Sequence, residues 1–354
     1  MKRVRGYSAC TLLLAASISG CSASSAGTPA AHPAEAAHSP EALLFEAARG
    51  WPVMGTVLEL RVTAPDKATA AKLADRAQQL VAHWDDVLTT WRSEGQLYRF
   101  NQRAGEGPQR IGHDLATALA SMLRLSGDTG GAFDPAVGPL VNYWREHPGL
   151  AAPAAAGPEV RIASALELNG DRASLLANSA LDSGGIGKGL ALDAAVDLLL
   201  SLGSRGAWLN FGGSSQAAFG SDSRGRPWRV AVAALDATTV HGSVLLDGRS
   251  LSTSRSTPAG DPAGSIIDPS SQRPVTEPRI ATVLAADGAT AEAWSTALVV
   301  LGRMGVQAAR DAGVEVVFED PAGVVITQGF PLERQRAESQ DSAAPTGPSS
   351  AGHK

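Results

Sequence analysis

The sequence has no excess of basic side chains: 30 Lys and Arg residues stand against 35 Asp and Glu, giving a formal net charge of −5. A general nucleic-acid-binding protein would normally carry a basic patch, so this balance argues against that class. No internal repeat and no long apolar segment beyond the N-terminal one is present. With 354 residues, 44% of them hydrophobic, the chain can still build the core of one large domain or two ordinary ones.

Cysteine occurs only twice, and both Cys10 and Cys21 belong to an N-terminal segment with the layout of a secretory signal peptide. Three basic residues precede an apolar run over residues 10–18, which is too short to span a bilayer as a mature anchor. Residues 18–21 resemble the lipobox of bacterial lipoproteins, and the alternative is an ordinary cleaved signal with an incidental cysteine. We expect a signal peptide over residues 1–20, lipidation of Cys21 and a mature chain without a disulfide.

Residues 22–40 are rich in Ala, Ser, Pro and His, a composition typical of a flexible tether. We therefore expect a tether over residues 21–48, one folded domain over 49–330 and a disordered tail over 331–354. A lipid on Cys21 would hold the domain at a bacterial membrane, facing the periplasm or the exterior. Ser22 follows the cysteine in place of Asp, which favours an outer membrane where the cell has one.

The spacing of apolar residues predicts the main helices and strands of the folded domain. Strands are predicted over residues 51–62, 207–211, 228–234, 243–251 and 280–285, with a hairpin over 315–327. Helices are predicted over residues 66–91, 114–128 and 289–301, with a polar loop over 92–101 and an irregular loop over 147–158. Neighbouring strands and few crossover helices predict an α+β fold, a single large domain of mixed, mainly antiparallel sheets with packed helices.

Residues 181–192 hold four glycines and Lys188, a rare lysine in this chain, between a strand-like and a helix-like apolar run. Glycine lets backbone N–H groups approach a ligand closely, and the following helix N-terminus favours an anion such as phosphate. The stretch fails the P-loop pattern at Asp182 and Gly189, and it fails the dinucleotide-binding pattern at Leu190. A strand–turn–helix connection with glycines for backbone geometry alone is the alternative.

Further short motifs accompany this loop in a fixed order along the chain. They cover residues 54–56, 89–101, 132–141, 209–213, 266–269 and 291–302, and the loop itself continues to Asp193. Together the seven motifs resemble the ApbE family of FAD:protein FMN transferases, flavin transferases of the bacterial envelope, from about residue 51 to about residue 329. The resemblance implies an enzyme that binds FAD with a divalent metal, usually magnesium. It also implies transfer of FMN to a Thr or Ser hydroxyl of a partner flavoprotein, with release of AMP.

The resemblance also assigns site residues. Flavin binding falls to Met54, Trp91, Ala132, Phe133, Asp134, Asp182, Lys188 and Ile266. Asp182 and Lys188 are the candidates for catalysis, and Lys188 with the loop N–H groups can supply the cation and donors that a diphosphate needs. Trp91 offers an aromatic face for the flavin ring, although it could instead be a core tryptophan that closes the long helix. Asp134 could instead cap a helix that begins near Val137.

A metal site is expected around the predicted helix over residues 289–301. Glu292 and Thr296 are four residues apart, so their oxygens share one helical face and suit a hard cation. The alternative for Glu292 is a solvated side chain on a surface helix. By the resemblance, the backbone carbonyl of Gly185 completes the ligands of Mg²⁺, and Ser295 stands where some members have a second Asp.

Several positions depart from the family pattern. Ser265 stands where a His is usual, Ser270 and Ser271 replace an Arg-Thr pair, and Glu292 is one C–C bond longer than the usual Asp. Magnesium demands near-ideal octahedral geometry, so flavin binding is better supported than transfer. Arg255 and Arg273 are the candidates for replacing the altered phosphate contacts. The alternatives are a catalytically weak FAD-binding envelope lipoprotein acting as carrier or assembly factor, an FAD pyrophosphatase, or an unrelated phosphate-ligand enzyme that uses the loop.

Overall fold

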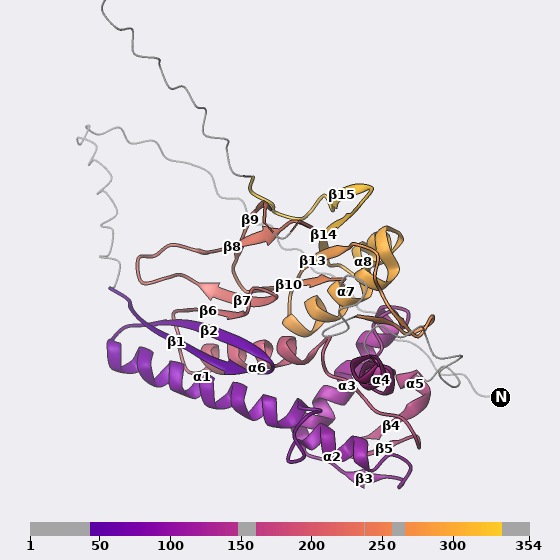
Figure 1. Cartoon of the computed structure of the whole chain (residues 1–354). Helices are drawn as coiled ribbons and strands as arrows, with labels where there is room; N and C mark the ends of the chain where they lie inside the picture. Colours follow the sequence, from indigo (N-terminus) through magenta and orange to yellow (C-terminus); the bar gives the residue numbers. More distant parts are fainter. Residues whose placement is uncertain (1–42, 148–160, 237, 257–265, 335–354) are drawn as a thin grey trace, which may run out of the picture. The chain divides into compact units, whose positions relative to one another are not determined.

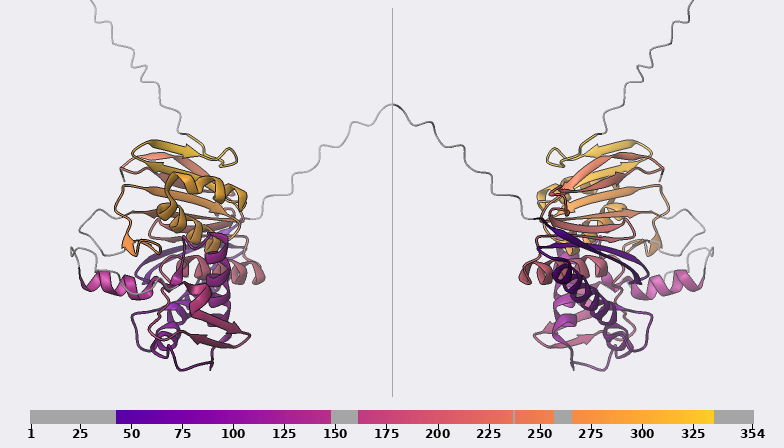
Figure 2. Two further views of the ribbon diagram at one scale, coloured as in Figure 1. Left: turned by 90° about the vertical axis from the view of Figure 1, so that its right-hand side faces the viewer. Right: turned by 90° about the vertical axis from the view of Figure 1, so that its left-hand side faces the viewer.

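The computed structural model describes residues 43–147, 161–236, 238–256 and 266–334, and one large antiparallel sheet organises them. Its strand order is β1-β2-β6-β7-β10-β13-β14-β15, and each neighbouring pair is antiparallel. Figure 2 shows this sheet from the indigo strands β1 and β2 to the yellow strand β15. The strands are β1 (Phe45–Val53), β2 (Thr56–Ala64), β6 (Gly206–Phe211), β7 (Ser215–Gly220), β10 (Arg249–Arg255), β13 (Ile280–Ala285), β14 (Glu315–Asp320) and β15 (Gly323–Ile326).

Two hydrophobic cores lie on opposite faces of this sheet. Helices α1 (Lys67–Leu88), α3 (His113–Asp128), α6 (Gly187–Ser201) and α7 (Gly288–Leu301) contribute to the larger core (Figure 1). The hairpin of β8 (Trp228–Ala233) and β9 (Val240–Leu246) covers the smaller core. Alternation along β13 assigns Val283 to the larger core and Leu284 to the smaller one, as expected for a sheet covered on both faces.

Short elements complete the domain. A small sheet joins β3 (Gln109–Arg110), β5 (Arg172–Leu175) and β4 (Leu166–Asn169), and a ribbon joins β11 (Ile267–Asp268) and β12 (Arg273–Pro274). The remaining helices are α2 (Gln96–Gln102), η1 (Pro135–Val137), α4 (Gly138–Glu146), α5 (Ile162–Ala165), η2 (Gly302–Met304) and α8 (Gly305–Asp311). The predicted α+β fold with mainly antiparallel sheets is confirmed.

Four predicted segments differ from the structure. The strand predicted over residues 51–62 is a hairpin, because Met54 and Gly55 adopt positive φ angles of 51° and 74° and reverse the chain. The strand predicted over 243–251 is likewise divided between β9 and β10 at Gly248, whose φ is 63°. The long helix ends at Leu88 rather than at Trp91, and the loop predicted over 92–101 contains α2.

The ends of the folded domain also differ from the prediction. Strand β1 begins at Phe45, inside the predicted tether, and Glu333 bridges Ser243 inside the predicted tail. The signal peptide, Cys21, most of the tether and tail, nearly all of the loop over 147–158, and Ser265 lie outside the described residues. In the part of the chain that the structure describes, no helix is long and apolar enough to cross a bilayer.

Candidate flavin and metal site

The glycine loop is held at its start by side chains from the first half of the chain. Asn101 on α2 accepts a hydrogen bond from the Leu181 backbone N–H at 2.9 Å and donates one to the Leu181 carbonyl at 2.8 Å. Ser183 donates to the carbonyl of Leu88 at the end of α1 (2.9 Å). These bonds fix the loop against α1 and α2, so the residues that follow enter α6 from a defined position.

Helices α6 and α7 contact each other through backbone atoms. A Cβ atom added to Gly189 would lie 2.3 Å from the carbonyl oxygen of Gly288, so only glycine fits there. Asp193 on α6 accepts hydrogen bonds from the N–H groups of Gly288 (2.5 Å) and Ala289 (3.0 Å) at the start of α7. Burial raises the pKa of Asp193 to about 7, against the lowering effect of these two donors.

Glu292 on α7 is buried and joined to the first turn of α6. Lys188 Nζ lies 2.8 Å from Glu292 Oε1, which also accepts a hydrogen bond from Ser215 Oγ at 2.6 Å. The backbone N–H of Gly189 donates to the other oxygen, Oε2, at 2.8 Å. Glu292 is only 3% exposed, so the alternative of a solvated surface glutamate is wrong. Sequence analysis did not identify Ser215 as a partner of this carboxylate.

A cavity of about 1110 Å³ opens beside the loop. It lies between the β1–β2 turn, the segment that follows α1, the segment that precedes α4 and the loop itself. Each of the residues predicted to bind flavin lines this cavity: Met54, Trp91, Ala132, Phe133, Asp134, Asp182, Lys188 and Ile266. Positions more than 200 residues apart in sequence therefore meet around one space large enough for a nucleotide.

The four predicted metal ligands are brought together only in part. Gly185 and Thr296 both line the cavity, and a Cβ on Gly185 would lie 3.1 Å from Thr296 Oγ1. A backbone carbonyl and a hydroxyl at this spot are hard oxygen donors of the kind that Mg²⁺ takes. The Glu292 carboxylate is on the same helical face as Thr296 but is bonded to Lys188. Among the described residues, no group of three or more His, Cys, Asp and Glu side chains could hold a metal.

Ser295 points away from this spot. It is completely buried, and its hydroxyl is hydrogen-bonded to Ser252 (3.0 Å) and Ser254 (2.8 Å) on β10. It also donates to the carbonyl of Glu292 at 3.0 Å. The structure therefore assigns Ser295 to the contact between α7 and β10 rather than to the predicted metal site.

Trp91 follows α1 and is 64% exposed, so the alternative of a core tryptophan that closes the helix is wrong. The guanidinium carbon of Arg145 on α4 lies 3.6 Å from the centroid of its ring, which is a stacked cation–π contact. An exposed aromatic ring at the edge of a cavity is suited to stacking on a planar ligand.

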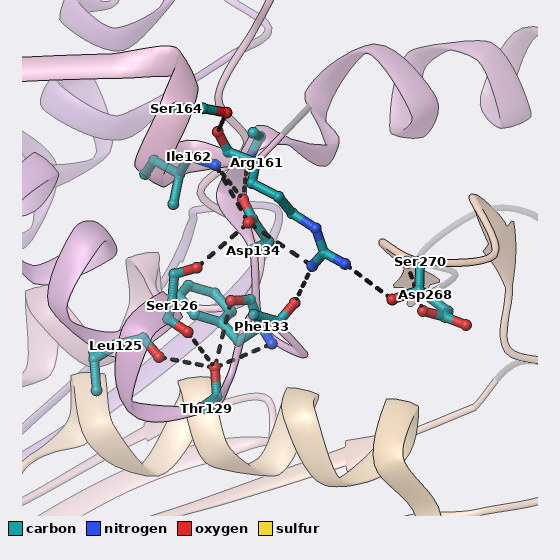
Figure 3. Close-up of polar contacts among 12 residues, drawn as sticks. Leu125, Ser126, Thr129, Phe133, Asp134, Arg161, Ile162, Ser164, Asp268 and Ser270 are labelled. Carbon is teal, nitrogen blue, oxygen red and sulfur yellow. Dashed lines mark hydrogen bonds and ion pairs between the residues drawn. The ribbon is translucent and has the colours of Figure 1, made fainter. Parts of the chain in front are cut away.

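Asp134 lines the cavity and is 4% exposed, and Figure 3 shows its carboxylate in contact with Ile162, Ser126 and Arg161. Its carboxylate accepts hydrogen bonds from the N–H groups of Ala136 (2.9 Å) and Ile162 (3.0 Å), and Arg161 lies 4.0 Å away. Burial raises its pKa, while these donors and the Arg161 charge lower it. Asp134 is the N-cap of the short η1, whereas α4, the helix that begins near Val137, has no side-chain cap.

Asp182 is the half-buried carboxylate at the entrance of the loop. Its Oδ1 accepts a hydrogen bond from the Gly184 N–H at 2.7 Å. Burial raises the pKa of Asp182, and the charges of Arg145 and Lys188 act against that rise. A carboxylate whose pKa moves toward neutrality, in a cavity lined by cations, is suited to accepting a proton.

The two arginines expected to replace the altered phosphate contacts differ in position. Arg255 lines the cavity but donates to the backbone carbonyls of Ala234 (2.8 Å) and Leu235. Arg273 on β12 is exposed and does not line the cavity. Sequence analysis missed Arg145, since nothing in its local pattern distinguishes it from an arginine on a helix surface.

Comparisons with known proteins show which family and which solved structures this chain is similar to. A model described as "ApbE family" matches residues 54–318. The FAD:protein FMN transferase of Klebsiella pneumoniae (strain 342) is 30% identical over 284 residues, which cover 74% of this chain and 81% of that protein. The solved structure of the Pseudomonas stutzeri flavinyl transferase ApbE, apo form, aligns with a TM-score of 0.70 and 27% identity over 80% of this chain and 94% of that one. The flavin transferase ApbE from Vibrio cholerae aligns with a TM-score of 0.67 and 26% identity, covering 80% and 97% of the two chains.

Proposed function

The chain belongs to the ApbE family, and we propose that it transfers FMN from FAD to a Thr or Ser hydroxyl of a partner flavoprotein, with release of AMP. The observation that carries the proposal is the cavity of about 1110 Å³, because every residue predicted to bind flavin lines it. The names of the relatives, FAD:protein FMN transferase, support the same reaction.

In this reaction the acceptor hydroxyl attacks the phosphorus of the FMN half of FAD. The bond from that phosphorus to the bridging diphosphate oxygen breaks, and AMP leaves. Asp182 is the group that accepts the hydroxyl proton, since it is the half-buried carboxylate in the cavity with a raised pKa. Lys188 holds the diphosphate from the start of α6, where its charge and the positive end of the helix dipole suit the negative charge of the ligand.

Magnesium is part of the proposal. The residues that would hold it are Gly185, through its carbonyl, and Thr296, through its hydroxyl, with Glu292 as the neighbouring carboxylate on α7. When bound, the ion supplies positive charge that offsets the charge of the diphosphate. The oxygen donors of this chain fit such a hard cation, although Glu292 would have to share its carboxylate with Lys188.

The location of the enzyme is proposed from the N-terminal sequence pattern. A lipid on Cys21 would tether the domain to a bacterial membrane, facing the periplasm or the exterior. Palmitate labelling of the full chain, with Cys21→Ala as the matched control, tests this point. Labelling that persists in Cys21→Ala would refute the lipid anchor.

The test of the reaction uses purified protein, FAD, Mg²⁺ and an acceptor domain with its target Thr. Flavin fluorescence of the acceptor in a denaturing gel and released AMP are the two readouts, and Thr→Ala in the acceptor is the control. We expect both products in equal amounts. AMP with free FMN would mean an FAD pyrophosphatase, and tight FAD binding without AMP would mean a carrier. An unlabelled acceptor, when a relative labels it, would refute the transfer.

A further inference from the structure

Four cationic side chains line the cavity: Arg92, Arg145, Lys188 and Arg255. Lys188 is paired with Glu292 at 2.8 Å, and the guanidinium of Arg255 donates to backbone carbonyls. The charge of Lys188 is therefore shared with a buried carboxylate, and N–H donors of Arg255 are occupied by the main chain.

Arg92 is also neutralised. Its guanidinium lies 2.8 Å from Asp85, 2.6 Å from Asp86 and 3.3 Å from Glu94. A cation with three carboxylate neighbours has little net attraction left for an anionic ligand.

Arg145 is different from the other three. Among the described residues it has no carboxylate within ion-pair distance, and its polar partner is Asn142 Oδ1 at 3.3 Å. Its guanidinium carbon instead lies over the ring of Trp91, 3.6 Å from the centroid. The side chain is exposed on α4, so a cationic group faces the cavity without a carboxylate to neutralise it.

Stacking on Trp91 leaves the N–H donors along the edge of the guanidinium free to bind a ligand. A planar guanidinium presents these donors as a fork that matches the oxygens of a phosphate. The cavity wall contains Arg145 together with Trp91 and residues of the glycine loop, and the charge of Arg145 lowers the pKa of Asp182 at the start of that loop. This is the region that a molecule with a planar ring and a phosphate would bridge.

We propose that Arg145 is a specificity-determining residue that binds the phosphate of the flavin nucleotide and selects FAD and FMN over riboflavin. This inference rests on the proposed flavin-transfer function, which it deepens. Stacking on Trp91 alone accepts any flavin, because riboflavin carries the same ring. The phosphate contact is therefore the part of the site that distinguishes FAD and FMN, which carry phosphate, from riboflavin, which does not.

The test measures dissociation constants of FAD, FMN and riboflavin from the quenching of flavin fluorescence. Arg145→Gln should lose about 10- to 100-fold in FAD and FMN affinity, as expected when a charged hydrogen-bond partner is removed, with riboflavin affinity unchanged. The FAD and FMN affinities of Arg145→Lys should lie between those of the unaltered protein and Arg145→Gln, because lysine keeps the charge but lacks the planar fork of donors. Arg92→Gln is the matched control: it removes the same charge from the same cavity and should leave the preference for FAD intact.

The salt dependence gives a second readout. FAD affinity of the unaltered protein should fall with ionic strength more steeply than that of Arg145→Gln, since the lost contact is electrostatic. Equal losses for FAD and riboflavin in Arg145→Gln would overturn the inference and leave Arg145 as a support for the Trp91 ring. Unchanged FAD affinity would overturn it as well. Both outcomes leave the proposed function standing, which fails only when the unaltered protein neither binds FAD nor labels the acceptor.

Discussion

Lys188 Nζ lies 2.8 Å from Glu292 Oε1, and this ion pair joins the first turn of α6 to the interior of α7. Ser215 Oγ and the Gly189 N–H bind the same carboxylate, so three donors surround a charge that is nearly inaccessible to water. Desolvation offsets much of the attraction in a buried pair of this kind. Its main effect is to fix the position of Lys188 relative to Thr296 across the cavity.

Removing the cation should destabilise the domain strongly. Lys188→Met leaves the Glu292 carboxylate buried without its partner, which costs about 3 kcal/mol of unfolding free energy. Urea unfolding measures this loss, and Lys188→Met combined with Glu292→Gln should recover most of it while transfer stays lost. Arg124→Met, which breaks an exposed pair with Asp128 on α3, should cost less than about 1 kcal/mol. Equal losses for the two single variants would contradict the prediction.

Two glycine-to-alanine substitutions should change the free energy of unfolding in opposite directions. Gly189→Ala adds a Cβ only 2.3 Å from the Gly288 carbonyl, and such overpacking against backbone should cost about 2 kcal/mol or more. Gly127→Ala in α3 meets nothing within 4 Å, so the better helix propensity of alanine should stabilise the domain by roughly 0.5–1 kcal/mol. Thermal and urea unfolding of both variants check this. A neutral Gly189→Ala would show that α6 and α7 can separate freely.

The raised pKa of Asp193 leads to a specific pH dependence of the free energy of unfolding. Its pKa is raised from 3.8 to about 7 in the folded chain, so between these pH values the native state binds a proton that the unfolded chain has released. The stabilisation that the protonated Asp193 carboxyl gives to the folded state is therefore fully present below about pH 4. It is lost as the pH rises to about 7. Relative to Asp193→Asn, the unaltered protein should lose up to about 1.4 kcal/mol of unfolding free energy per pH unit in this window.

Urea titrations of both proteins from pH 4.5 to pH 7.5 measure this difference. Other carboxylates affect the two proteins alike, so the subtraction isolates Asp193. A difference that stays constant with pH would show that the carboxyl is ionised throughout.

Substitution of the two tryptophans that line the cavity should have different effects: one should weaken FAD binding, and the other should lower the free energy of unfolding. Trp91→Ala should leave the unfolding free energy nearly unchanged, because the side chain is exposed, while the KM for FAD rises about tenfold through lost stacking. Trp144 is buried, and its Nε1–H donates to the Gln272 carbonyl at 3.1 Å. Trp144→Ala should therefore destabilise the domain by about 3 kcal/mol. Trp91→Phe keeps an aromatic face and should restore most of the FAD affinity; an inactive Trp91→Phe would speak against stacking.

The order of motifs along the chain was enough to predict which residues surround the cavity. Met54 and Ile266 lie in different halves of the sequence, yet both line the same space as the loop. The family resemblance makes this prediction possible because proteins that share the motifs are expected to share the fold, which brings the motifs together in space. Periodicity alone did not reveal the reversal at Met54–Gly55, since apolar residues stand on both sides of the turn, at Val53 and at Val57.

Side-chain direction could not be predicted on a helix that is buried on nearly every side. Most residues of α7 are inaccessible, so the apolar pattern marks no exposed face from which the direction of Ser295 could be read. Its hydroxyl binds serines of β10, whose positions depend on strand register in the large sheet. The contact of Arg145 with Trp91 likewise depends on how α4 packs beside the end of α1, which local sequence does not encode.

The contact between Gly189 and Gly288 has a consequence for which substitutions the domain can accept during evolution. With no side chain at either position, main-chain atoms of α6 and α7 are in direct contact there. Substitutions in the surrounding core can alter volumes without moving Lys188 relative to Thr296. A core of different composition can therefore keep the same distances across the site. The dimensions of the site are independent of the composition of the core that supports it.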